Sequence, residues 1–375
     1  MLILAVDIGT GTQDILLFDS EREVENCHKM VMPSPTVQLA RAVRAATRRA
    51  QDVLLTGVLM GGGPCAWAVR DHLKAGCGVY VTPSAAQTFD DDLEAVAALG
   101  VTLVSEDEAL ALRGRATHLC MHDFDYHVIA HAFAQFGLNL DCGLDALAVA
   151  VFDHGNAPPG TSDRLFRFQY LADRVRAENR LSAFAYCAED VPEIMTRMRV
   201  VAATIPRDDI PVMLMDTAPA AVLGALEDPV ISQRRPVIVL NVGNFHCLAF
   251  RLGRVGIEGV FEHHTGEMTL AQMEDFLDRL AEGALTHNEV FDTQGHGAII
   301  FHSKPLPPEA RFLAVTGPRR NMLRQSRHKA FFAAPFGDMM MAGCYGLIRA
   351  YADVSPEHAP IIQRALAGGN SRSLW

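Results

Sequence analysis

Positive charge is scarce in this sequence, and lysine is the scarcest of its sources. Of the 375 residues, 33 are lysine or arginine against 44 aspartate or glutamate, which gives a formal net charge of −11. Lysine occurs only at Lys29, Lys74, Lys304 and Lys329. Proteins that hold nucleic acids present a surplus of positive charge to the phosphates. We therefore expect no nucleic-acid partner.

Long apolar runs and cysteine motifs are also missing. No uninterrupted apolar stretch approaches the ~18–20 residues of a membrane span, so we expect no membrane partner. Residues 1–6 have the pattern of a short strand and lack the basic leader and cleavage site of a secretory signal. The eight cysteines include no CxxC pair, which argues against a local zinc or iron–sulfur cassette and favours reduced thiols. Together these absences predict a cytoplasmic protein.

What is present is an alternation of apolar strands and amphipathic helices. Apolar runs predict strands at 52–60, 78–82, 144–155, 210–216 and 311–317, and helical spacing predicts helices at 38–50, 165–180, 191–203, 268–284 and 339–351. This alternation is typical of α/β proteins with a parallel or mixed sheet that is covered on its faces. At 375 residues, the chain is long enough for two domains.

Two stretches far apart in the sequence share one plan. In DIGTGTQDILLFD, which starts at Asp7, and in NVGNFHCLAFRLG, which starts at Asn241, a strand ends in an acidic or amide side chain, passes through a glycine turn and resumes as a second apolar strand. Glycine lets the backbone turn and approach an anion closely, and the N–H groups of such a turn form an anion-binding concavity. Alone, either hairpin is most simply an ordinary β-turn. As a pair, the hairpins predict a clasp that holds a polyphosphate from two sides.

Two other phosphate-binding motifs can be excluded. The sequence has no Gly-Lys dipeptide, which the Walker A loop requires. The stretch that starts at Gly9 lacks a third glycine and leads into a strand rather than a helix, so it is not a dinucleotide-binding fingerprint.

The order of five motifs resembles that of the actin, Hsp70 and sugar-kinase superfamily of ATPases. Residues 7–14 resemble the first phosphate motif of that superfamily, and residues 241–246 resemble the second. The other three are residues 216–226 as the first connecting helix, 315–320 as the adenosine motif, and 337–351 as the second connecting helix. Within the superfamily, the chain is most similar to a prokaryotic family whose members are sometimes labelled pyruvate formate-lyase activating enzyme-like. That label implies a CxxxCxxC cluster motif, which this sequence lacks, so we expect no radical chemistry.

The resemblance implies an α/β fold of the two-lobe, actin-like ATPase (ribonuclease H-like) type, with ATP and Mg²⁺ bound between the lobes. The first lobe would cover residues 1–233 with an α/β insertion at about 52–118, the second lobe would cover 234–338, and the segment 339–375 would return to the first lobe. The residues that the resemblance assigns to the nucleotide are Gly9, Thr10, Gly11, Thr12, Gln13, Asn241, Gly243, Asn244, Gly317, Pro318, Arg319, Gly337 and Asp338.

The same resemblance suggests where Mg²⁺ and the chemistry would lie. Asp7 and Asp216 follow strands, and such carboxylates hold Mg²⁺ or its waters. Asp153, with His154 beside it, is the expected catalytic base, because it ends a first-lobe strand that would face the terminal phosphate. The alternative for Asp153 is a structural cap of the loop before Gly155. His246, at the second hairpin tip, is either a contact to phosphate or a packed side chain.

The second hairpin departs from the superfamily pattern. Asn241 stands where an acid is usual, Asn244, Phe245 and His246 stand where glycine and threonine are usual, and Pro318 replaces a glycine of the adenosine motif. The first change removes one contact to the waters of Mg²⁺. We therefore expect nucleotide binding rather than fast turnover.

Three functions are compatible with these features. The first is Mg-ATP binding with hydrolysis or with phosphoryl transfer to a small hydroxylated or carboxylated molecule. The second is a nucleotide-dependent switch that acts on a partner protein, for which the insertion at 52–118 would offer a surface. The third is a degenerate binding protein with little turnover. The oligomeric state cannot be inferred from the sequence.

Overall fold

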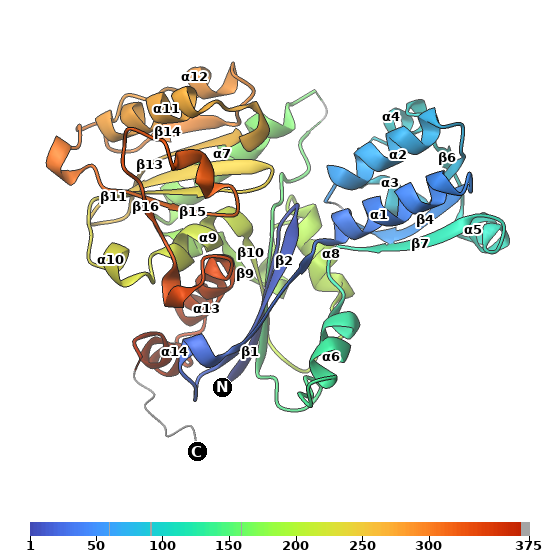
Figure 1. The fold of residues 1–375 in the computed structure, drawn as a ribbon, viewed down its shortest axis with the longest axis horizontal. Coiled ribbons are helices and arrows are strands. Elements are labelled where there is room, and N and C mark those ends of the chain that lie inside the picture. The colour runs from blue at the N-terminus through green and yellow to red at the C-terminus, as the bar shows by residue number, and fades with distance from the viewer. Residues whose placement is uncertain (60, 91, 159, 369–375) are drawn as a thin grey trace.

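The computed structural model describes residues 1–59, 61–90, 92–158 and 160–368. They form three sheets, each covered by helices (Figure 1). None of the helices in these ranges combines the length and the apolar character that crossing a bilayer requires.

The first sheet has the strand order β3-β2-β1-β8-β10-β9. Its strands are β1 (Leu2–Ile8), β2 (Thr12–Asp19), β3 (His28–Pro33), β8 (Ala146–Val151), β9 (Ala185–Cys187) and β10 (Val212–Asp216). The first three strands are antiparallel neighbours, whereas β8 and β10 run parallel to β1. Every residue of β8 is buried, which explains why its sequence is an unbroken apolar run instead of an alternating one.

The second sheet repeats this plan with the order β14-β13-β12-β11-β15-β16. Its strands are β11 (Val237–Val242), β12 (His246–Leu252), β13 (Ile257–His264), β14 (Gly297–Ile300), β15 (Leu313–Thr316) and β16 (Phe331–Phe332). Again an antiparallel hairpin is followed by a third antiparallel strand, and the later strand β15 pairs in parallel with the first. Two ribonuclease H-like sheets in one chain constitute the two-lobe, actin-like ATPase fold, which confirms the predicted fold class.

Helices cover both faces of each of these sheets. In the first sheet, α6 (Tyr126–Ala134) and α8 (Thr196–Thr204) pack on one face, and α13 (Ala342–Val354) with α14 (Ala359–Leu366) packs on the other. In the second sheet, α11 (Leu270–Glu282) and α12 (His287–Phe291) cover the outer face, and α7 (Asp163–Ala177) with α9 (Thr217–Ala225) covers the inner one. The short helix α10 (Pro229–Ser232) leads from α9 into the second sheet.

Helices α9 and α13 cross at the junction of the two sheets, and glycines bring their backbones together. A Cβ atom at Gly224 of α9 would collide with the carbonyl oxygen of Ala342, and one at Gly346 of α13 would collide with that of Ala220. The two helices can therefore pack only with glycine at these positions. This crossing fixes how the lobes meet.

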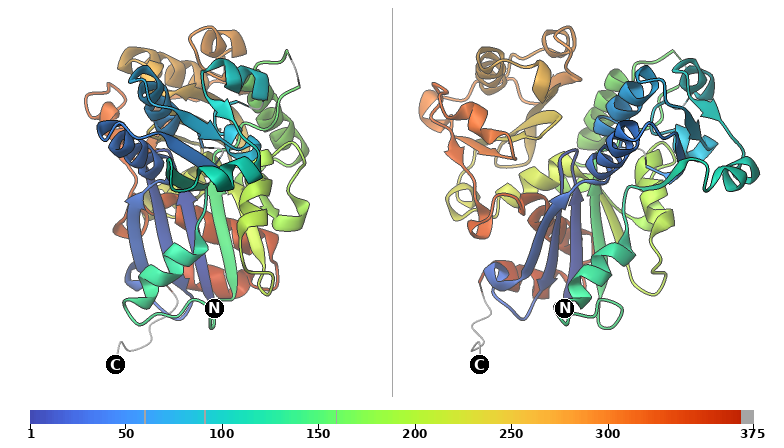
Figure 2. Two further views of the ribbon diagram at one scale, coloured as in Figure 1. Left: turned by 90° about the vertical axis from the view of Figure 1, so that its right-hand side faces the viewer. Right: turned by 45° about the vertical axis from the view of Figure 1, so that its right-hand side comes forward.

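The third sheet is a separate, all-parallel layer with the order β6-β5-β4-β7. It contains β4 (Val53–Val58), β5 (Val79–Val81), β6 (Thr102–Leu103) and β7 (Thr117–His122), with helices α1 (Pro35–Arg48), α2 (Pro64–Lys74), α3 (Pro83–Ala86), α4 (Leu93–Ala98) and α5 (Glu106–Leu112). Helix α1 contributes Leu39, Ala40, Val43 and Ala46 to the core of this unit. The unit thus begins before the insertion expected at 52–118 and ends after it. Figure 2 shows the second and third sheets side by side above one end of the first sheet.

Two predicted helices are shifted in the structure for local reasons. The helix expected at 191–203 begins only at Thr196, because Val191 and the residues up to Met195 form an irregular segment that contains Pro192. The helix expected at 339–351 spans Ala342–Val354, since the chain first turns after Asp338, whose side chain accepts the backbone N–H of Met340.

Candidate functional site

A cavity of about 950 Å³ lies where the three sheets meet. Its walls come from the β1–β2 hairpin, the β11–β12 hairpin, the loop after β8 and the start of α2. Of the residues predicted from the sequence, those that line it are Asp7, Gly9, Thr10, Thr12, Asp153, His154, Asn241, Gly243, Asn244, Gly317 and Pro318. The structure therefore brings residues from opposite ends of the chain to one site.

Other predicted residues do not line the cavity. They are Gly11, Gln13, Asp216, Arg319, Gly337 and Asp338, among the described residues. Gln13 lies on the other face of β2, where its side-chain amide donates to the carbonyl of Pro33 at 3.1 Å, because successive side chains of a strand alternate between faces. Gln13 therefore does not line the cavity, and its contact with a nucleotide stays a prediction.

Arg319, Gly337 and Asp338 hold the turns beside the cavity. The backbone N–H of Arg319 donates to the carbonyl of Val242 at 3.0 Å, which ties the end of β15 to the second hairpin. Gly337 has a φ of +76°, which allows the turn before α13. The structure thus gives these residues positioning roles in the backbone.

The tip of the first hairpin is closed by hydrogen bonds and supported from outside. The N–H of Gly9 donates to the carbonyl of Thr12 at 2.9 Å, which makes a tight turn. Ser34, the N-cap of α1, donates its hydroxyl to the carbonyl of Thr10 at 2.7 Å and its N–H to that of Gly11 at 3.2 Å. Ser34 was not predicted from the sequence, although a serine before Pro35 is a common helix start.

Below this tip, Asp7 and Asp14 form a buried acidic pair. They are register partners across the hairpin, so their side chains lie on the same face, and both line the cavity. Burial raises the pKa of Asp7 to about 7, and burial together with the nearby Asp7 charge raises the pKa of Asp14 to about 8. Thr217 donates its hydroxyl to Asp7, but no ion pair reaches either carboxylate within the described chain. One oxygen of Asp14, Oδ1, is buried without a hydrogen-bond partner there.

Asp14 and Thr217 lie within two of the motifs, but no role was predicted for their side chains, although the sequence holds a signal for Asp14. In a two-stranded hairpin, residues at equal distances from the turn face each other, so Asp14 had to lie opposite Asp7. The contact of Thr217 with Asp7 could not be predicted in this way, because Thr217 follows a different strand, β10, which lies far from Asp7 along the chain.

The second hairpin is held in a similar way and touches the first. Its turn closes through a bond of 2.9 Å from the N–H of Gly243 to the carbonyl of His246. Thr265 donates its hydroxyl to the carbonyl of Gly243 at 2.9 Å and its N–H to that of Phe245 at 2.8 Å. The side-chain amide of Asn244 occupies the place that a Cβ on Gly11 would take. The two tips are therefore in direct contact, and glycine at position 11 allows it.

The third unit reaches the same hairpin tip through an aromatic contact. Trp67 of α2 lies with its ring centroid 6.1 Å from that of Phe245. Gly63, at the start of α2, stands next to Thr10 of the first hairpin. The insertion thus closes one side of the cavity.

Asp153 is bound on both carboxylate oxygens by backbone groups. Its Oδ1 accepts the N–H of Gly155 at 2.8 Å, and its Oδ2 accepts that of Met198 at 2.9 Å. Burial raises the pKa of this carboxyl group, against the lowering effect of these hydrogen bonds. These two hydrogen bonds are those of a structural loop cap, which was the alternative to a catalytic base for Asp153. They hold in place the loop that carries His154.

Asp216 belongs to a buried network that joins the lobes. Its carboxylate caps the N-terminus of α9 at the N–H of Ala218, at 3.1 Å, and pairs with Arg167 of α7. The Nε of Arg167 lies 3.4 Å from Glu262 of β13, and this arginine is only 1% exposed. Asp216 thus lies in an ion pair inside the protein and does not line the cavity, and its metal role stays a prediction.

Burial and charge oppose each other in this network. Burial lowers the pKa of Arg167, but Asp216 and Glu262 raise it, so the guanidinium stays charged. Burial raises the pKa of Glu262 to about 7, although Arg167 lowers it. No sequence motif pointed to Arg167 or Glu262, because their partners lie far away along the chain.

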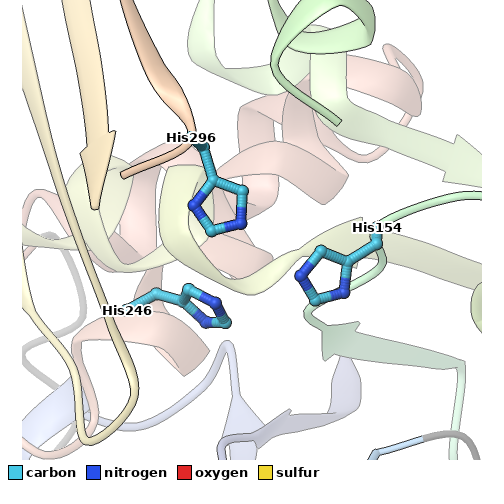
Figure 3. A group of neighbouring side chains, drawn as sticks. All are labelled: His154, His246 and His296. Carbon is cyan, nitrogen blue, oxygen red and sulfur yellow. The ribbon is translucent and has the colours of Figure 1, made fainter. Parts of the chain in front are cut away.

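Three histidines converge beside this network (Figure 3). His154 follows β8, His246 begins β12, and His296 directly precedes β14, and each offers a ring nitrogen to a group of atoms that lie within 4.8 Å of one another. The ring of His264 borders the group, with its centroid 4.8 Å from those of His246 and His296. His296 and His264 could not be recognised from the sequence, since neither stands in a local motif.

All members of this cluster are neutral at neutral pH. Burial, with the neighbouring Arg167 charge, lowers the pKa of His154 to about 3. Burial and the neighbouring histidines lower the pKa of His246 and His296 well below the usual value. Phe152 stacks on His246 with a centroid distance of 4.0 Å, and the guanidinium of Arg167 lies over the Phe152 ring, 4.4 Å from its centroid.

Three solved structures are distantly similar to this chain. The ethanolamine utilization protein EutJ from Carboxydothermus hydrogenoformans has 10% identity and a TM-score of 0.32 over 92% of this chain and 89% of that one. A carbohydrate kinase from Novosphingobium aromaticivorans has 12% identity and a TM-score of 0.24 over 99% and 92%. A propionate kinase from Francisella tularensis subsp. tularensis SCHU S4 has 8% identity and a TM-score of 0.22 over 97% and 76%. These values carry no argument about activity.

The sequence comparisons give a family. A search of curated protein sequences finds no significant match. The profile of one protein family matches residues 60–322, which is more than half of the chain. The chain therefore belongs to the family described as "Putative pyruvate format-lyase activating enzyme (DUF1786)".

Proposed function

We propose that this protein binds Mg-ATP in the cavity between the two hairpins and hydrolyses it or transfers its phosphoryl group to a small molecule. The observation that carries the proposal is the Asp7–Asp14 pair, two buried carboxylates without a basic partner in the described chain, on the wall of a cavity large enough for a nucleotide. Like charges in a desolvated site are costly unless a cation joins them.

The residues present fit a magnesium ion. Mg²⁺ prefers carboxylate, phosphate and water oxygens, and Oδ1 of Asp14 is a buried oxygen with no other partner in the described chain. When bound, Mg²⁺ neutralises phosphate charge as phosphoryl transfer proceeds. Asp7 and Asp14 would hold the ion or its waters, with the hydroxyl of Thr217 orienting Asp7.

The two hairpin tips would hold the phosphates from both sides. The backbone around Thr10 and Gly243 lines the cavity, and turns of this kind present N–H groups to anions. Asn241 and Gly317 line the far wall, where Gly317 has a φ of +95° and lies against the side chain of Asn241. Only a residue without a Cβ fits there, because a Cβ would collide with the Asn241 side chain and the Val242 carbonyl.

The family description implies iron–sulfur radical chemistry, and the residues do not fit it. The described residues include one group of three or more histidine, cysteine or acidic side chains arranged for a metal. The members of that group are all histidines. All eight cysteines are free thiols. We therefore derive no step through an iron–sulfur cluster.

Isothermal titration of the full chain with ATP and Mg²⁺ tests the proposal. We expect saturable heat with the wild type, and an affinity at least about tenfold lower, or roughly 1.4 kcal/mol, for Asp7→Asn and Asp14→Asn. Asp19→Asn is the matched control, since Asp19 lies at the opposite end of the same strand as Asp14. No heat from the wild type, or equal affinities for all four proteins, would overturn the proposal.

A second candidate function, a nucleotide-dependent switch that acts on a partner protein, is favoured by one contact. Trp67 of the third unit meets Phe245 at the second hairpin tip, so a movement of that tip would be transmitted to the insertion. The partner would bind the third unit. A pull-down with and without Mg-ATP tests this, and a partner set that ignores the nucleotide would contradict it.

A further inference from the structure

The three histidines at the lobe junction are not used by the proposed function. His154 belongs to the loop after β8 of the first sheet, whereas His246 and His296 belong to the second sheet (Figure 3). His154 and His246 line the cavity, and His296 lies behind them with no exposed surface. The cluster thus spans the two lobes and faces the cavity on one side.

Three ring nitrogens of this cluster are left without partners among the described residues. Nε2 of His246 and both nitrogens of His296 are buried and form no hydrogen bond to any described residue. Each unpaired polar group of this kind destabilises the folded chain. One ring nitrogen from each of His154, His246 and His296 lies within 4.8 Å of the other two, so the arrangement is unfavourable as a packed core and favourable as a ligand set.

We propose that His154, His246 and His296 bind a transition-metal ion of the zinc class. Zinc, cobalt, nickel and iron(II) accept neutral imidazole as a ligand, whereas Mg²⁺ takes oxygen. Coordination bonds of ~2.0–2.1 Å in a tetrahedral site separate ligand atoms by roughly 3.4 Å, so side-chain rotations that draw the rings slightly together complete the site.

The residues around the three histidines fit a metal ion that has three imidazole ligands and one open coordination position. Glu262, the acid on the neighbouring strand, is paired with Arg167 and is not a member of the group. Three protein ligands leave the fourth position of a tetrahedral ion for water or a substrate oxygen. Because His154 and His246 line the cavity, that position faces the cavity. The site would therefore place a Lewis acid beside the ligand pocket.

This inference stands on the histidines alone and does not depend on nucleotide binding. The test uses the full chain, stripped of metal and titrated with Co²⁺ in the absence of nucleotide. Tetrahedral cobalt gives visible absorption bands that report imidazole ligation directly. We expect one equivalent to bind to the wild type with these bands, and Zn²⁺ to displace it.

Substitution of single ligands sharpens the test. His154→Gln, on a loop, and His246→Gln should each lower the Co²⁺ affinity by more than about 100-fold and remove the bands, because loss of a ligand exceeds the loss of an outer-sphere partner. His302→Gln, an exposed histidine in the same lobe, is the matched control and should bind as the wild type does. Circular dichroism confirms that each variant is folded.

Two results would overturn the inference. The first is a folded wild type that binds neither Co²⁺ nor Zn²⁺. The second is stoichiometric binding with unchanged bands in both His154→Gln and His246→Gln, which would place the ion elsewhere. His264→Gln separates a bordering residue from a ligand: a loss equal to that of His246→Gln would contradict the three-histidine set.

Discussion

Single side chains at the cavity are held away from their ordinary protonation states. Burial raises the pKa of Asp7 and Asp14 to about 7 and 8, and it lowers the pKa of His154 to about 3. In both cases burial favours the neutral form. The acids are therefore only partly charged at neutral pH without a cation, whereas the imidazole is ready to act as a ligand.

The acidic pair predicts a dependence of stability on pH. The folded pKa of Asp14, about 8, lies above its ordinary value of 3.8, so between these values the folded chain holds a proton that the unfolded chain has lost. The free energy of unfolding must then fall as pH rises from about 4 to 8. With EDTA present, Asp14→Asn should gain on the order of 2 kcal/mol over the wild type at pH 8.5 and little at pH 4.

Urea unfolding at the two pH values measures this difference. Asp19→Asn serves as the control and should follow the wild type at both values. An advantage of Asp14→Asn that is equal at pH 4 and pH 8.5 would contradict the raised pKa.

At the scale of elements, the crossing of α9 and α13 brings two helix backbones into direct contact. Its glycines meet carbonyl oxygens of the opposite helix, so a side chain at either place forces the helices apart. The partner of α9 is the same helix whose Gly343 lies against the carboxylate of Asp7. A shift of α13 would therefore also disturb the acidic pair.

Gly346→Ala should destabilise the protein by about 1–3 kcal/mol, because the new methyl group has no space beside Ala220. Urea unfolding measures the loss, and titration with Mg-ATP measures the effect on the site. Gly266→Ala is the matched control, since a Cβ at Gly266 meets nothing within 4 Å. Equal stability of the two variants would mean that the helices can separate freely.

The elements were easier to predict from the sequence than the contacts between them. Apolar runs predicted many of the strands, and the repeated hairpin plan predicted two similar turns, because both depend on residues near one another along the chain. The partners of Asp216, the convergence of His296 with His154, and the caps on Asp153 depend on residues brought together by folding. A local sequence motif cannot predict contacts between residues that are far apart in the chain.

The whole molecule closes its cavity with parts of all three units. The hairpin tips meet at Gly11 and Asn244, and Trp67 meets Phe245 on the outer side. A nucleotide between the tips would have to move at least one of them. The fluorescence of Trp67 should report that movement, because its indole contacts Phe245 and is 48% exposed, so its exposure to water can change.

Addition of Mg-ATP should change the intrinsic fluorescence of the wild type through Trp67. We expect the change to disappear in Trp67→Phe and to weaken in Phe245→Ala. Phe136→Ala, which alters an exposed aromatic ring far from the contact, should respond as the wild type does. A response that persists in full in Trp67→Phe would assign it to Trp375 and contradict a movement at the hairpin tip.

The placement of α13 sets the order in which the chain can fold during synthesis. The core beneath the first sheet contains Ile3 and Leu16 from the start of the chain and Leu347 and Ile348 from near its end. A ribosome releases the N-terminal strands long before the helix that covers them exists. The first lobe therefore cannot complete its core until the second lobe has been synthesised, and one apolar face of its sheet stays exposed until then. We expect nascent chains of this protein to depend on holding chaperones until α13 and α14 leave the ribosome.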